Sequence, residues 1–167
     1  PGMSWHGVDK LIEFAKRYPE ITINIVGYGP GDVDGDVPAN VKLHGFLNSQ
    51  QVKDVLAGTD VACGTLAFHR NKMHEASALK VREALTFGIP VLIAFRDTDL
   101  HDVHVDTILQ IPNTEDNLVT HAEQVHDFAY RMMGKRVDLS VVGPYLDQRK
   151  KEQKRLAFFE QVLVGKK

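Results

Sequence analysis

The sequence has 167 residues, of which 43% are hydrophobic and 25% are charged, as in an ordinary globular domain. This composition excludes a collagen-like, low-complexity or wholly disordered chain. A formal charge of −2 indicates no general attraction to nucleic acid, and we expect no nucleic-acid partner. The one cysteine, Cys63, excludes an internal disulfide framework and fits a reducing compartment. The longest apolar run, over 89–95, is too short to span a bilayer.

Two hydrophobic patterns alternate along the chain: helical stretches with apolar residues three and four apart, and short runs rich in valine and isoleucine. In chain order, the first half predicts a helix with Val8, Leu11, Ile12 and Ala15 on its buried face, strands over 21–28 and 41–45, a helix over 49–58 and a strand over 60–65. The second half predicts a helix over 77–87, strands over 90–95 and 107–111, a helix over 116–133 and a C-terminal amphipathic helix over about 145–164. Ser49 is expected to cap the second of these helices.

Strands that alternate with helices predict an α/β fold, a Rossmann-like parallel sheet with helices on both faces. We expect residues 1–167 to form one such domain, with the apolar strand over 90–95 at its centre. In a sheet of this kind, ligands bind in the crevice at the carboxyl ends of the strands. The loops that should line this crevice cover 28–40, 46–49, 66–77 and 96–106.

The segment 66–90 holds the densest group of residues with chemical function. A basic loop that includes Arg70 leads to Glu75, and a helix that carries Lys80 and Glu83 begins near Ser77. Free backbone amides at the start of a helix bind anions, and carboxylates accept hydrogen bonds from sugar hydroxyls. A ligand with a diphosphate between two polyhydroxyl groups suits this arrangement, and a nucleotide sugar is such a ligand.

Four segments in this order resemble the retaining glycosyltransferases of family 4. They are WHGVDKLI at 5–12, IVGYGP at 25–30, VKLHGFL at 41–47, and Glu75-x7-Glu83 followed by GIPV at 88–91. That family has the GT-B fold, in which two Rossmann-like domains face each other across a cleft. The resemblance covers only the C-terminal half, which binds the nucleotide-sugar donor.

The resemblance implies a role for each matched residue. Glu75 would face the hydroxyls of the transferred sugar as the catalytic residue, and Glu83 would bind the ribose. The remaining donor-binding residues would be the amides of Ser77, Ala78 and Leu79 at the distal phosphate, Lys80 and Arg70 as added positive charge, and Gly27, Gly29, Phe46 and Leu47 near the nucleoside. The family needs no metal and no cofactor beyond its donor.

The chain also departs from the family pattern. Ala76, Ser77 and Ala78 replace the usual glycine turn after the first carboxylate, and His6 stands where the family has a lysine. The strand that carries the family's phosphate-binding arginine, and the whole acceptor-binding domain, would precede Pro1. This polypeptide alone is therefore expected to bind a donor poorly and to transfer nothing.

Other interpretations stay open at this stage. A non-catalytic, flavodoxin-like module that binds a nucleotide or phosphate and regulates a partner is the alternative function. His101, His104 and Asp106 have the density of a metal site, although a polar surface loop is the favoured interpretation. The basic and apolar C-terminal helix could pack on the domain, cross to a second domain, or touch a membrane peripherally. We expect a cytoplasmic enzyme, with the inner face of the membrane as the site of any such contact.

Overall fold

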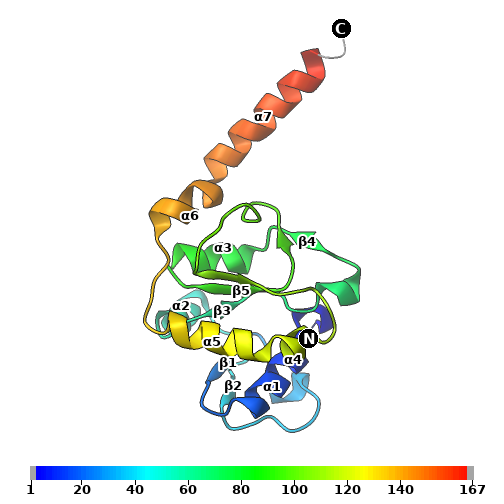
Figure 1. The fold of residues 1–167 in the computed structure, drawn as a ribbon, viewed down its shortest axis with the longest axis vertical. Coiled ribbons are helices and arrows are strands. Elements are labelled where there is room, and N and C mark those ends of the chain that lie inside the picture. Colours follow the sequence, from blue (N-terminus) through cyan, green and yellow to red (C-terminus); the bar gives the residue numbers. More distant parts are fainter. Residues whose placement is uncertain (1–2, 165–167) are drawn as a thin grey trace.

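The computed structural model describes residues 3–164 (Figure 1). Its short strands all pair in parallel, and helices surround them. The strands are β1 (Ile23–Ile25), β2 (Val41–Leu43), β3 (Ala62–Cys63), β4 (Glu75–Ala76), β5 (Val91–Ile93), β6 (Arg96–Asp97) and β7 (Ile108–Gln110). The helices are α1 (Val8–Arg17), α2 (Ser49–Ala57), α3 (Leu79–Thr86), α4 (Asn117–Thr120), α5 (Ala122–Met132), α6 (Leu139–Leu146) and α7 (Gln148–Val164), with short 3₁₀ turns η1 (Ser4–His6), η2 (Pro30–Asp32) and η3 (Phe68–Asn71).

Strand β5 is the centre of the fold, as its apolar sequence predicted. It pairs with β3 on one side and β7 on the other, and all its residues are buried. Val91 and Ile93 join the core cluster that includes α3 and α6, whereas Leu92 joins the cluster that includes α1, α4 and α5. Alternate residues of a strand point to opposite faces, so helices cover both faces of this sheet and confirm the predicted α/β fold.

The sheet is divided more finely than predicted. β1 and β2 form a sheet of their own, β3, β5 and β7 form a second one, and β4 and β6 form a third. At the carboxyl ends of β1 and β3 lies the segment Met3–His6, which is not a strand. Leu66 N–H donates to the His6 carbonyl, and the Tyr28 hydroxyl lies 2.9 Å from the Met3 amide. This segment therefore joins the two sheets at one end without extending either ladder.

Strands β4 and β6 were not predicted, because each is a short segment with charged residues and neither lies in an apolar run. Their pairing places Glu75 opposite Arg96 and Ala76 opposite Asp97. The extended backbone at 75–76 also delays the next helix, so α3 begins at Leu79 and not near Ser77. The loops over 66–77 and 96–106, which are distant in sequence, are thereby paired beside the start of α3.

Helix starts depend on local hydrogen bonds that the pattern located only approximately. Asn48, and not Ser49, caps α2: the Gln51 amide donates to its side-chain oxygen at 3.0 Å, and the Gln51 side chain accepts from the Asn48 amide at 2.9 Å. This reciprocal pair is a capping box, which satisfies two amides at once. The prediction of a Ser49 cap was one residue too late.

The predicted helices in the C-terminal part of the chain differ most from the observed ones. The helix predicted over 116–133 is interrupted at His121, which separates α4 from α5. Helix α6 includes Pro144 and ends before Asp147, whose backbone is extended, so the last helix begins at Gln148. Helix α7 has no buried residue and projects from the body of the protein (Figure 1). Its apolar side chains therefore do not pack on the domain, and the predicted domain ends at 1–2 and 165–167 lie outside the described residues.

Candidate functional site

The start of α3 lies at the carboxyl ends of the parallel strands, where the sequence placed the anion site. Ala78 occupies the N-cap position, and no side chain accepts a hydrogen bond from the first turn. In contrast, Asn48 caps α2 and Asp138 caps α6. Within the described residues, the amides of Ser77–Lys80 make no backbone hydrogen bond, so they are available to an external acceptor.

Glu75 lies on β4, four residues before the first residue of α3. Its carboxylate accepts a hydrogen bond from Arg96 Nη1 at 2.9 Å, and both side chains are more than half exposed. An ion pair with this exposure is weak, and a ligand hydroxyl can compete for the same oxygen. Glu75 is therefore accessible, with a guanidinium directly beside it.

Glu83 and Lys80 both lie on α3, one turn apart. Glu83 is exposed and makes no ion pair, with Lys80 or with another residue, in the part of the chain that the structure describes. Although Lys80 is an exposed residue, the protein around its ammonium lowers the pKa of that group. The charge of Lys80 also helps to lower the pKa of His6, after the larger effect of burial.

The other predicted phosphate residues have different surroundings. Leu79 is 81% exposed, so it offers its amide and no packing. The Ser77 hydroxyl donates to Asp99 Oδ2 at 2.8 Å, which fixes the turn before α3. Sequence reasoning missed Asp99, because nothing in the pattern relates residue 99 to residue 77.

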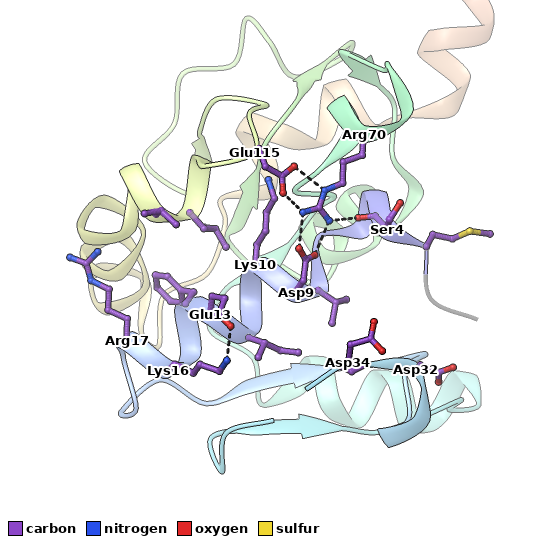
Figure 2. Close-up of a pocket in the computed structure, with 17 residues that line it drawn as sticks. Ser4, Asp9, Lys10, Glu13, Lys16, Arg17, Asp32, Asp34, Arg70 and Glu115 are labelled. Carbon is purple, nitrogen blue, oxygen red and sulfur yellow. Dashed lines mark hydrogen bonds and ion pairs between the residues drawn. The ribbon is translucent and has the colours of Figure 1, made fainter. Parts of the chain in front are cut away.

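Among the described residues, Arg70 forms no hydrogen bond with the start of α3. Its guanidinium donates to both carboxylate oxygens of Asp9, at 2.9 and 2.7 Å, and also binds Glu115 and the Ser4 carbonyl (Figure 2). Hydrogen bonds from Arg70 and His69 lower the pKa of Glu115 to about 2, and the two carboxylates raise the pKa of Arg70. The predicted phosphate role of Arg70 stays a prediction, and in this arrangement two carboxylates neutralise the guanidinium.

Residues of the predicted nucleoside region lie in the turns after β1 and β2. Gly27 has φ of +88°, a backbone conformation that favours glycine, and its amide donates to the Gly45 carbonyl at 2.7 Å. The Gly29 amide donates to Asp32 at 2.8 Å. Phe46 is 86% exposed and Leu47 is partly buried. The two turns are thus hydrogen-bonded to each other, and the Phe46 ring is open to a stacking partner.

A pronounced groove lies away from the start of α3. This groove of about 740 Å³ runs along α1, and of the predicted donor-binding residues only Arg70 lines it (Figure 2). Its other polar lining residues are Ser4 and charged residues of both signs: Asp9, Lys10, Glu13, Lys16, Arg17, Asp32, Asp34 and Glu115. The acidic and basic groups largely pair with one another, so this groove presents no single charge to a ligand.

Other candidate chemistry is limited within residues 3–164. No group of three or more histidine, cysteine, aspartate or glutamate side chains is placed to hold a metal there, and His101 lies 3.1 Å from Asp102. Burial raises the pKa of the Cys63 thiol to about 11, as expected for a core residue and not for a nucleophile. Over the same residues, every helix is too short or too polar to cross a bilayer. Neither a model of a known protein family nor a curated protein matches this chain.

Proposed function

We propose that this chain is the donor-binding part of a retaining, nucleotide-sugar-dependent glycosyltransferase. The observation that carries the proposal is the uncapped start of α3, which is flanked along the chain by two exposed carboxylates, Glu75 and Glu83. A second part that binds the acceptor would complete the enzyme. The acceptor would belong to a growing polysaccharide, glycolipid or glycoprotein glycan in the cytoplasm or at the inner face of the membrane.

The diphosphate of the donor would bind at the start of α3. The amides of Ser77, Ala78 and Leu79 have no backbone partner in the described chain, and the positive end of the helix dipole favours an anion there. Lys80 adds a cation at the same turn. Fixed donors of this kind stabilise the charge that develops on a departing diphosphate, and such stabilisation is the main catalytic effect we infer.

The two carboxylates would hold the sugars on either side of the diphosphate. Glu83 would accept hydrogen bonds from the ribose hydroxyls, and Glu75 from the hydroxyls of the transferred sugar. Hydrogen bonds to a charged group are stronger than neutral ones, so each carboxylate can orient a ring. Phe46, exposed in the turn after β2, would stack on the base.

The test separates a nucleoside-diphosphate site from a simple phosphate site. We expect UDP, GDP or ADP to shift the amide resonances of 77–80 in an NMR titration of the chain. Glu83→Ala should weaken this binding by about tenfold, the loss of a hydrogen bond to a charged group, and should leave inorganic pyrophosphate binding unchanged. Glu160→Ala, at an exposed position on α7, is the matched control.

Two results would contradict the proposal. Absence of binding by all three nucleotides at millimolar concentration would remove the donor site. Equal affinity for pyrophosphate and for the best nucleotide would favour the alternative, a regulatory module that recognises phosphate alone.

A further inference from the structure

Among the described residues, one side chain of α7 forms a hydrogen bond with the body of the protein. Lys151 is the only residue of α7 that is not exposed, and its ammonium donates to Asp99 Oδ2 at 2.7 Å. Every other residue of the helix, from Gln148 to Val164, is exposed. Lys151 is therefore the residue through which α7 is hydrogen-bonded to the body of the protein, among the residues that the structure describes.

Asp99 is the point at which three distant segments meet. Its Oδ2 accepts from Lys151 on α7, from the Ser77 hydroxyl before α3, and from Arg82 on α3. Partial burial favours the neutral acid, but the hydrogen bonds from Lys151, Arg82 and Ser77 outweigh this effect and lower the pKa of Asp99 to about 2. Asp99 is thus a carboxylate at neutral pH, and it lies within one hydrogen bond of the proposed phosphate turn.

The charges of this group are balanced. Arg82 and Lys151 supply two positive charges, and Asp97 and Asp99 supply two negative charges. Arg82 is already engaged by the fully buried Asp97, so Lys151 is the cation that offsets Asp99. Without Lys151, the cluster would carry a net negative charge beside Ser77, where a diphosphate is proposed to bind.

We propose that Lys151 is a positioning residue for the donor site: it neutralises Asp99 and so allows the diphosphate to approach the turn that Ser77 begins. This inference rests on the proposed function, and it adds α7 to the site. A change in the position of α7 that separates Lys151 from Asp99 would weaken donor binding in the same way as loss of the ammonium.

A double-mutant cycle between Lys151 and Asp99 tests this proposal. With the NMR titration above, Lys151→Met should weaken binding of the best nucleoside diphosphate by roughly fivefold, because one uncompensated charge near an anion has about this effect. Asp99→Asn keeps an acceptor for Ser77 and should tighten binding by a similar factor. The double variant should bind as the unmodified chain does, and Lys151→Arg should retain full affinity.

The control is Lys150→Met, since Lys150 is exposed and forms no ion pair among residues 3–164. The effect of Lys151→Met should also shrink as salt rises, which a purely structural role would not produce. Unchanged affinity in Lys151→Met, or a double variant as weak as Lys151→Met, would overturn the role of Lys151 and leave the donor site intact. Absence of nucleotide binding by the unmodified chain would overturn both proposals.

Discussion

Two arginines in this protein each bind two carboxylates, and they differ in how much water reaches them. The Arg82 side chain is 9% exposed and its partner Asp97 is 1% exposed. The Arg70 side chain is 21% exposed, while Asp9 and Glu115 are 59% and 65% exposed. The hydrogen bonds look alike in the two clusters. Their energetic weights should differ, because removal of one buried partner leaves an uncompensated charge in a medium that solvates it poorly.

The two clusters also differ in what else they hold. Asp97 accepts hydrogen bonds from the backbone amides of Asp99 and Leu100, at 3.0 and 3.1 Å, in addition to those from Arg82. It therefore fixes the backbone of the turn that carries Asp99. Arg70 joins η3 to α1 through side chains that solvent already reaches. The comparison teaches that burial, and not the number of hydrogen bonds, identifies the cluster on which the fold depends.

The largest effect should come from the buried cluster. Asp97→Ala should lower the free energy of unfolding by about 3–5 kcal/mol, because Arg82 stays buried without its partner and two amides lose their acceptor. Urea denaturation followed by circular dichroism measures this change, with Asp54→Ala on the exposed face of α2 as the control. A loss below about 1 kcal/mol would show that water enters the cluster freely.

The pH dependence of stability should show an intermediate effect from Asp99. Its pKa is about 2 in the folded protein and 3.8 without perturbation. The folded state therefore gains stability above pH 3.8, on the order of 2 kcal/mol, and loses it as the pH falls toward 2. Thermal unfolding measured between these pH values should show that the melting temperature falls less steeply with decreasing pH in Asp99→Asn than in the unmodified chain. An unchanged slope would mean that Asp99 does not contribute to acid sensitivity.

The smallest effect should come from the exposed cluster. Asp9→Ala removes a two-point ion pair with Arg70, yet we expect a loss of at most about 1 kcal/mol, since solvent screens the pair and Glu115 still binds the guanidinium. Urea denaturation beside Asp97→Ala gives the direct comparison. Equal losses for the two variants would remove the distinction between buried and exposed clusters.

The carboxylates and helix-start amides that the sequence suggested for the candidate site all lie in one segment of the chain. Glu75, Glu83 and the amides of 77–79 lie in one segment, so their spacing alone suggested an anion site between two carboxylates. Asp99 and Lys151 could not be found in this way. The Ser77–Asp99 hydrogen bond joins residues 22 apart in sequence, and the Lys151–Asp99 hydrogen bond joins residues 52 apart. No local pattern encodes pairs at such separations.

For the fold, hydrophobic periodicity by itself determined the α/β class, the order of the principal helices and strands, and the central place of β5. This was enough because the spacing of apolar residues within each element shows which of its faces is buried. Tertiary structure alone decided the division into three small sheets, the pairing of β4 with β6, and the projection of α7. These features arise from contacts between segments distant in sequence, whose free energy depends on burial and charge after the chain has folded.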